Sequence, residues 1–189
     1  KAFFAVVTMR LVGRGLLALD TPVASLVPAF PGTATLADLL SHRAGLSDWQ
    51  PLYRELAPEE VATPKGRARI RALAASRAGP PTVEPRYSDL GFIVLGELLE
   101  RASGLDLAAL LDREVRAPLG LSEVTFRPDP SSRVVATERC PWRGRLLCGE
   151  VHDENAYAMG GVSAHAGLFA TARAVAAFGA AVLDALSGA

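Results

Sequence analysis

The first fourteen residues constrain the fold most, because they predict a helix that is apolar on nearly every side. Apolar residues recur through segment 1–14 without keeping to one face: Phe3, Phe4, Val6, Val7, Met9, Leu11 and Val12. A helix of this kind is buried among other elements. Arg10 and Arg14 form its one polar stripe, near the C-terminal end that favours cations, and Gly13 and Gly15 end the helix.

Helices are predicted along most of the remaining chain. The predicted spans are 36–42, 58–78, 89–103, 107 to about 116, and 172 to about 186. Thr35, Ser88 and Asp106 precede three of them as N-cap residues. A short strand is expected only at 124–126, and the segment 127–170 is rich in loops. A loop stretch of that length in a compact domain is usually functional or disordered.

Composition limits the classes of function. The chain has 189 residues, half of them hydrophobic, which suits one domain with a sizeable core. The formal net charge is zero, so a nucleic-acid-binding surface is not expected. The basic stretch Lys65 to Arg71 lacks interleaved aromatic residues and is interpreted as a solvated helix face. No apolar run is long enough for a membrane span.

Five motifs occur in a fixed order along the chain. They are Leu16–Val23 (L-L-A-L-D-T-P-V), Thr35–Leu46 (T-L-A-D-L-L-S-H-R-A-G-L), Tyr87–Phe92 (Y-S-D-L-G-F), Pro118–Leu121 (P-L-G-L) and Gly160–Ala172, which begins G-G-V and ends F-A-T-A. The ordered set resembles the β-lactamase-related serine hydrolase superfamily, of the class C β-lactamase, penicillin-binding protein and esterase type. Ala44 stands where that family usually has Ser. The resemblance covers nearly the whole chain.

The resemblance implies an α+β, β-lactamase/transpeptidase-like fold. Residues 1–189 would form a partial domain, truncated at both ends, that supplies the nucleophile helix and the mostly helical subdomain. Most of the β-sheet would lie outside the chain. The chain opens with Lys1 instead of Met and shows no signal peptide, so an upstream segment is expected and the compartment stays open. The helix 1–14 should therefore expose apolar surface that the sheet would cover.

Lys1 and Tyr87 are the catalytic residues that the resemblance implies. Lys1 falls on the lysine of the family's S-x-x-K motif, so the nucleophilic serine would lie three residues before it. Residues three apart share a helix face, which lets the amine reach the hydroxyl. A tyrosine beside the lysine would act as general base or proton shuttle, because the cation favours its phenolate. Asp89 would bind substrate or Lys1.

Without that serine, the chain is not expected to be catalytic by itself. The family's last motif, Lys or His followed by x-Gly on a strand, is expected beyond Ala189. The triplet His165-Ala166-Gly167 has the same shape. It precedes a predicted helix instead of lying on a strand, so it is interpreted as a lookalike.

A histidine-rich loop supplies further substrate-binding candidates. His152, Asp153, Asn155 and His165 lie in two stretches, 152–156 and 160–167, that resemble a signature of one branch of the superfamily. The loop either lines the substrate cleft or is held in shape by hydrogen bonds of its His and Asp side chains. His42, in the motif 35–46, is expected to have a structural, partly buried role.

Metal binding is a rival interpretation of the same loop. Potential ligands are Cys140, Cys148, His152, Asp153 and His165, but their spacing matches no standard zinc pattern. No metal and no cofactor is therefore predicted. The two cysteines leave a loop disulfide, free thiols and a metal pair open.

Three hypotheses of function follow. The first is a serine hydrolase that transfers the acyl group of a β-lactam, a D-amino-acid peptide or an ester, with a small molecule or peptide as its partner. The second is a non-catalytic relative that binds such ligands, and the third is a metal-binding helical domain. A serine three positions before Lys1 favours the enzyme over the binding module. Absence of stoichiometric zinc would dismiss the third.

Overall fold

The computed structural model describes residues 1–129 and 134–188 of the chain. Its helices, in chain order, are α1 (Ala2–Gly13), α2 (Val23–Leu26), α3 (Leu36–Leu40), η1 (Leu52–Glu55), η2 (Pro58–Glu60), α4 (Pro64–Ser76), α5 (Asp89–Ser103), α6 (Leu107–Leu111), η3 (Asp112–Arg116), α7 (Ala117–Leu119), α8 (Glu154–Ala158) and α9 (Ala172–Ser187). Strands β1 (Arg139–Cys140) and β2 (Arg145–Leu146) pair antiparallel in the one sheet of the described residues. Helix dominates, as predicted. No described helix is long and apolar enough to cross a membrane.

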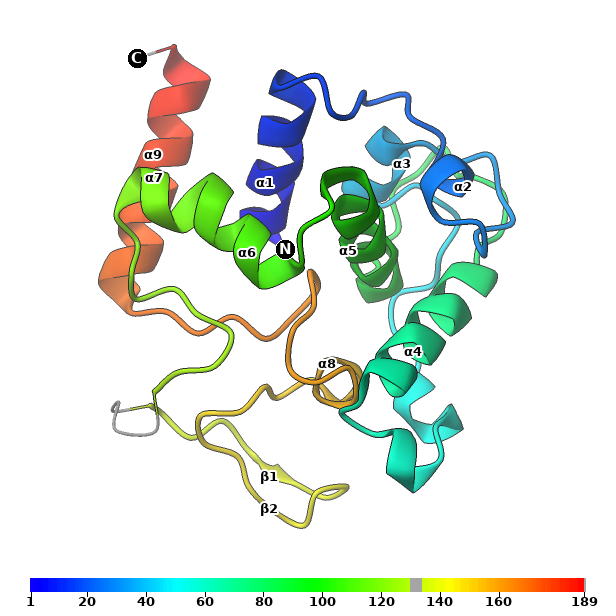
Figure 1. Ribbon diagram of the computed structural model, residues 1–189, viewed down its shortest axis with the longest axis vertical. Coiled ribbons are helices and arrows are strands. Elements are labelled where there is room, and N and C mark those ends of the chain that lie inside the picture. The colour runs from blue at the N-terminus through cyan, green and yellow to red at the C-terminus, as the bar shows by residue number, and fades with distance from the viewer. Residues whose placement is uncertain (130–133, 189) are drawn as a thin grey trace.

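Helix α5 is the centre of the core. Ser88 caps its N-terminus by accepting a hydrogen bond from the Gly91 N–H, and Gly104 ends it in the left-handed conformation, both as predicted. Helices α2, α3, α4 and α6 all pack against it. In Figure 1 α5 lies between α1 and α6 on one side and α3 and α4 on the other. Helix α5 is consequently enclosed on several sides.

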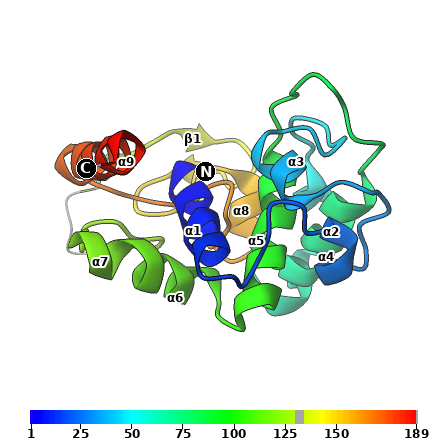
Figure 2. The same cartoon turned by 90° about the horizontal axis from the view of Figure 1, so that it is seen from above.

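Helix α1 begins near the middle of the molecule, so Lys1 lies inside the fold instead of at its edge (Figure 1). Phe4, Val7 and Leu11 are fully buried, and α1 packs against α6 and η3. Phe3 stacks on Phe178 of α9, with the ring centroids 4.0 Å apart. Figure 2 shows α1 between α9 and α5. Met9 is 49% exposed, which agrees with the prediction that part of this helix presents apolar surface.

Glu114 ties α1 to η3. Its side chain is fully buried, and its Oε2 pairs with Arg10 Nε at 3.2 Å and with Arg14 Nη2 at 3.1 Å. Arg113 Nε pairs with Oε1 at 2.8 Å. The predicted polar stripe of α1 therefore neutralises a buried carboxylate, which a charge inside a protein requires.

The predicted helix 58–78 is wrong, because the chain breaks at 61–63. Pro64 restricts the preceding residue to extended backbone, and Thr63 has φ −107° and ψ 162°. Ala62 has a positive φ of 60°, and its N–H donates to the Ala158 carbonyl 2.8 Å away. The break thus gives a short turn, η2, and a separate helix, α4, with α8 docked at the gap.

The loop region was only partly predicted. Segment 124–126 is not a strand but contributes one isolated bridge, between Thr125 and Phe169. The segment 127–170 contains β1, β2 and α8, which were not predicted because each is only two to five residues long. Helix 107–116 was predicted, although its second half, η3, is a π-helical turn.

Candidate active site

Lys1 is the N-cap residue of α1, and its ammonium lies among groups from three distant segments. Its Nζ is 2.5 Å from Asp89 Oδ1 and donates to the His165 carbonyl 3.2 Å away. The Tyr87 ring centroid is 4.9 Å from Nζ. The Lys1 and Asp89 side chains are each 20% exposed, so the pair is shielded but reachable. The structure therefore brings Lys1, Tyr87 and Asp89 together.

The start of α5 places Tyr87 and Asp89. Ser88 lies between them and donates its hydroxyl to the Ser47 carbonyl at 2.6 Å while its side chain caps the helix. The Asp89 N–H donates to the Asp48 carbonyl, also at 2.6 Å. With its neighbours held in this way, Tyr87 is directed outward and is 59% exposed. Its phenol is open to a substrate.

His42 supports the same corner from the motif 35–46. Its Nδ1 accepts a hydrogen bond from the Ser88 N–H at 3.1 Å. Its ring centroid lies 4.9 Å from that of Tyr87 and 5.4 Å from that of Phe92. Burial, and next the positive charge of Lys1, lower the pKa of His42. A neutral imidazole is the form that accepts a hydrogen bond at Nδ1.

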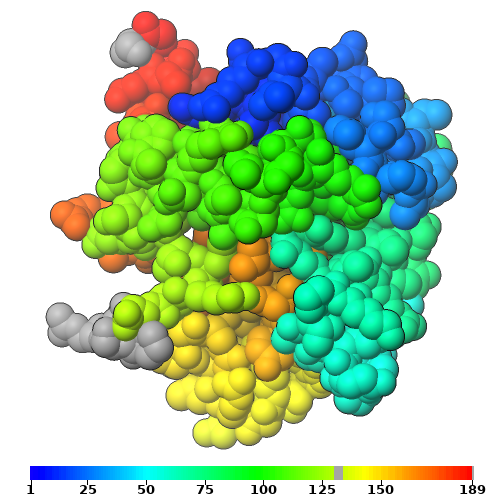
Figure 3. All heavy atoms as spheres, in the orientation of Figure 1, coloured from blue at the N-terminus to red at the C-terminus, as the bar shows by residue number. Residues whose placement is uncertain are grey.

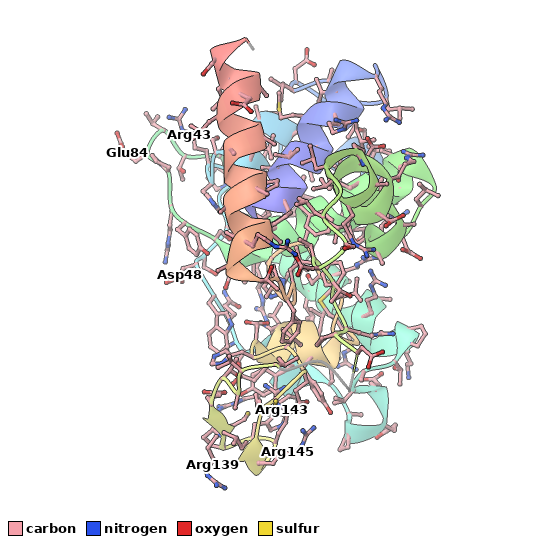
Figure 4. All side chains as sticks on the ribbon, turned by 90° about the vertical axis from the view of Figure 1, so that its left-hand side faces the viewer. Arg43, Asp48, Glu84, Arg139, Arg143 and Arg145 are labelled. Atoms are coloured by element: carbon pink, nitrogen blue, oxygen red, sulfur yellow. The ribbon has the colours of Figure 1, made fainter. Side chains whose placement is uncertain are left out.

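Gly45 packs directly against the backbone at Gly79 and Pro80, in the loop that leads to Tyr87. It has a φ of +71°, and a Cβ added there would lie 2.4 Å from the Pro80 carbonyl oxygen. The loop after Gly79 also pairs with this motif, because the Arg86 N–H donates to the His42 carbonyl at 2.8 Å. Figure 4 shows Arg43, Asp48 and Glu84 along the edge of the molecule that these two loops form.

Lys1 is held in its charged form. Burial by itself would lower the pKa of the ammonium, but the hydrogen bond to Asp89, the contact with Tyr87 and the negative charge of Asp89 outweigh it and raise the pKa above its ordinary value of 10.5. At neutral pH the amine is therefore a cation, and cations stabilise negative charge on a neighbouring oxygen.

Asp153 and His165, from the histidine-rich loop, are bonded to each other. Asp153 caps α8, and its Oδ1 lies 2.9 Å from His165 Nε2. His165 Nδ1 is 2.7 Å from the Ser163 hydroxyl oxygen. Trp49 Nε1 donates to Asp153 Oδ2 at 3.3 Å. The His165 side chain is only 1% exposed, so it faces the protein interior.

Asn155 and His152 lie in different surroundings. Asn155 is fully buried, accepts from the Tyr53 N–H at 2.9 Å and donates to the Gln50 carbonyl at 2.8 Å, which ties α8 to η1 and to the segment before it. His152 is exposed, with its Nδ1 3.7 Å from Glu138 Oε1. Hydrogen bonds hold the buried part of the loop in shape, while His152 is available to a ligand.

A groove of about 1120 Å³ runs beside this loop. His152 and Asp153 line it, together with Thr125, Arg127 and Thr171. In the space-filling view a hollow is seen between the green helices and the yellow-green segment below them (Figure 3). The predicted site residues thus form one group at Lys1 and one along the groove, with His165 bonded to both, whereas the buried Asn155 belongs to neither.

The five potential metal ligands do not gather as one set. His165 pairs with Asp153, the buried Cys140 accepts from Arg143 Nε at 3.4 Å, and the exposed Cys148 contacts the Val134 carbonyl. Both cysteines are free thiols. A different trio lies within 4.8 Å of one another in the described residues: Glu138, Cys140 and Glu154.

Ser163 and Trp49 were not predicted as part of this arrangement. Trp49 bonds to Asp153, which is far away in the sequence, and Ser163 bonds to His165 within one loop. Neither residue belongs to a periodic pattern. Only His165 and Asp153 have residue types that are typical of a functional site. The hydrogen bond from Lys1 Nζ to the His165 backbone carbonyl cannot be predicted from the sequence.

The Beta-lactamase family model matches residues 1–188. A "Putative D-alanyl-D-alanine carboxypeptidase" of Escherichia coli K12 is 30% identical over 187 residues, covering 85% of this chain and 43% of that protein. An "N-acetylmuramyl-L-alanine amidase" of Bacillus subtilis is 30% identical over 193 residues, covering 86% and 43%. The crystal structure of a penicillin-binding protein from Bacillus halodurans superposes with a TM-score of 0.72, at 21% identity, over 96% of this chain and 57% of that one. The chain spans less than half the length of the carboxypeptidase and amidase relatives.

Proposed function

The chain belongs to the beta-lactamase family, and on that premise we propose that it supplies the lysine and tyrosine of a serine hydrolase that works by acyl transfer. The nucleophile would be a serine three residues before Lys1. The observation that carries the proposal is the ammonium of Lys1, 2.5 Å from Asp89 and 4.9 Å from the Tyr87 ring. A charged lysine beside an open phenol suits a base that must remove a serine proton.

The position of Lys1 supports the role of the serine. Lys1 precedes the first turn of α1, so a serine one turn earlier would extend this helix and share the face of the lysine. The positive end of the helix would then stabilise negative charge that develops near the serine oxygen.

Tyr87 would perform the proton transfers. Its phenolate oxygen would take the serine hydroxyl proton while the serine oxygen bonds to the acyl carbon. The same proton would pass to the leaving group as the bond from that group to the acyl carbon breaks. Water would then attack the acyl-serine ester. Tyr87 would take the proton of the water and pass it to the serine oxygen, and the acid product would be released. Lys1, held charged by Asp89, would stabilise the phenolate between these steps.

The substrate would be a β-lactam, a D-amino-acid peptide or an ester. The relatives named as a carboxypeptidase and an amidase both act, by their names, on amide bonds, which makes cell-wall peptides the first substrates to examine. Asp89, His152, Asp153, Asn155 and His165 remain the candidates for binding or shaping the substrate site. Of these five, His152 and Asp89 have the most exposed side chains, which favours direct contact with a substrate.

A substrate panel on the full-length protein tests this proposal. It contains a D-alanyl-D-alanine peptide, a chromogenic cephalosporin and a short p-nitrophenyl ester. We expect turnover of at least one and its loss in Lys1→Ala, with Lys65→Ala as a matched control on the 81% exposed lysine. Binding of the peptide without turnover of any substrate would favour a non-catalytic ligand-binding module instead.

A further inference from the structure

The imidazole of His165 is bonded on both sides, although acyl transfer by Lys1 and Tyr87 does not use a ring at this place. Its partners are Asp153 Oδ1 at 2.9 Å and Ser163 Oγ at 2.7 Å. Both Ser163 and His165 are buried, at 2% and 5% exposure. A buried polar network with every member satisfied rigidifies its surroundings.

The protonation of the network follows from Asp153. Burial would raise the pKa of this carboxyl, but the hydrogen bonds that it accepts from His165, from the Ala156 N–H and from Trp49 lower the pKa below its ordinary value of 3.8. A carboxylate only accepts hydrogen bonds, so Nε2 of His165 donates to it. In the neutral ring Nδ1 then accepts from the Ser163 hydroxyl.

A second nucleophile is excluded at this network, although its residue types are those of a Ser-His-Asp triad. Ser163 is 2% exposed, so a substrate carbonyl has no access to its oxygen. The serine and histidine also belong to one loop, two residues apart, which keeps the hydroxyl pointed into the protein.

The network instead fixes the orientation of the backbone carbonyl of His165. The His165 carbonyl accepts the hydrogen bond of Lys1 Nζ at 3.2 Å. The preceding residue, Ala164, packs closely on Gly96 of α5. A Cβ added at Gly96 would lie 3.2 Å from the Cβ of Ala164. Further on, Phe169 and Thr125 exchange two backbone hydrogen bonds. Between these anchors, the ring of His165 sets the orientation of the peptide that faces Lys1.

We propose that His165 is a positioning residue: its bonds to Asp153 and Ser163 hold its carbonyl against the ammonium of Lys1 and so place the lysine for the function proposed above. The side chain acts through the backbone and touches no substrate. Misplacement of a catalytic group by about 1 Å can cost on the order of 10²-fold in rate.

The test uses Asp153 in the full-length protein, because this residue can be varied without loss of the α8 cap. Asp153→Ser keeps a side chain that caps a helix but is too short to reach His165, whereas Asp153→Asn keeps both the cap and an oxygen acceptor. Asp106→Ser is the matched control, because Asp106 caps α6 in the same way and is not linked to Lys1.

The readout is the rate at which an amine-reactive acylating reagent modifies Lys1, followed by peptide mass spectrometry. We expect Asp153→Ser to raise this rate several-fold, Asp153→Asn and Asp106→Ser to leave it near that of the wild type, and the exposed Lys65 to react equally in all four proteins. An unchanged Lys1 rate in Asp153→Ser overturns the inference. Equal effects of Asp153→Asn and Asp153→Ser also overturn it.

Turnover distinguishes this inference from the proposed function. With a hydrolysed substrate, we expect Asp153→Ser to lower kcat by about 10-fold or more, since Lys1 is displaced, whereas Asp106→Ser should leave kcat unchanged. If the wild type hydrolyses nothing, the function fails, but the Lys1 modification rates still decide the positioning role. If Asp153→Ser does not fold, His165→Gln, which keeps a donor for Asp153, is compared with His165→Leu in the same assay.

Discussion

The ammonium of Lys1 lies 2.5 Å from the carboxylate of Asp89, so the first residue of the chain and the first turn of α5 share one charge pair. The pair stands beside the exposed phenol of Tyr87. Because both side chains are largely shielded from water, the carboxylate has a strong influence on the lysine proton.

Replacing Asp89 by Asn should lower the pKa of Lys1, because Asp89 makes the largest contribution that raises it. A lysine with a raised pKa contributes stability that is complete below its ordinary value of 10.5 and is lost as pH rises through the higher folded value. If charged Lys1 supports acylation, the alkaline limb of the pH–rate profile should move to lower pH in Asp89→Asn. Asp48→Asn, at an exposed residue 3.8 Å from Arg86, should leave it in place. An unmoved limb in Asp89→Asn would count against a charged Lys1.

His42 should make the folded protein less stable in mild acid. Its folded pKa is lowered by burial and by Lys1, so as pH falls below 6.5 the unfolded chain takes up a proton that the folded chain resists. Stability is then lost until pH reaches the folded pKa. In His42→Asn, whose side chain tolerates the positive φ of 59° and offers an acceptor to Ser88, the urea midpoint should fall less between pH 7.5 and pH 5. His152→Asn, at an exposed histidine, is the control and should behave as the wild type.

Gly45 and Gly104 form a matched pair for backbone strain. Both have a φ of +71°, but a Cβ at Gly45 meets backbone oxygens at 2.4 and 2.5 Å, whereas a Cβ at Gly104 meets nothing within 4 Å. Gly104→Ala should cost about 1 kcal/mol, the usual penalty of the left-handed conformation. Gly45→Ala should cost roughly 3 kcal/mol or more, because the clash adds to that penalty. Equal losses in chemical denaturation would mean that the loop at Gly79 yields to the added methyl group.

Glu114→Ala should destabilise the fold by about 2–3 kcal/mol, below the usual cost of breaking a buried ion pair because the arginines left behind are exposed to water. Arg10→Ala should cost less than about 1 kcal/mol, since Arg14 and Arg113 still neutralise the carboxylate. Chemical denaturation measures both losses, with the exposed Glu59→Ala as control. A larger loss from Arg10→Ala than from Glu114→Ala would contradict the shared neutralisation.

Much of this fold was predictable from local sequence. The capping residues Thr35, Ser88 and Asp106 each precede a helix as expected, since a cap is a local interaction. Family membership and the α+β, β-lactamase/transpeptidase-like fold class are also confirmed. The predicted helix 58–78 was wrong because Pro58 and the acidic residues after it start only the short turn η2, and Pro64 starts a separate helix after the extended Thr63.

The candidate site was predictable only in part. The family resemblance implied that Tyr87 and Asp89 lie near Lys1, and the structure brings these three side chains together, while their roles stay predictions. The hydrogen bond that the His165 carbonyl accepts from Lys1 was not predictable, since every residue has a backbone carbonyl. The hydrogen bond from Trp49 to Asp153 likewise depends on how two distant loops pack.

The site of covalent acylation tests the central claim most directly. The full-length protein is treated with a fluorophosphonate or a labelled penicillin, and the adduct is mapped by peptide mass spectrometry. We expect the label on a serine three residues before Lys1, no label in its Ser→Ala variant, and acylation slower by about 10²-fold or more in Tyr87→Phe, as for loss of a general base. A different labelled residue would contradict the assigned nucleophile, and normal acylation of Tyr87→Phe would contradict the role of Tyr87.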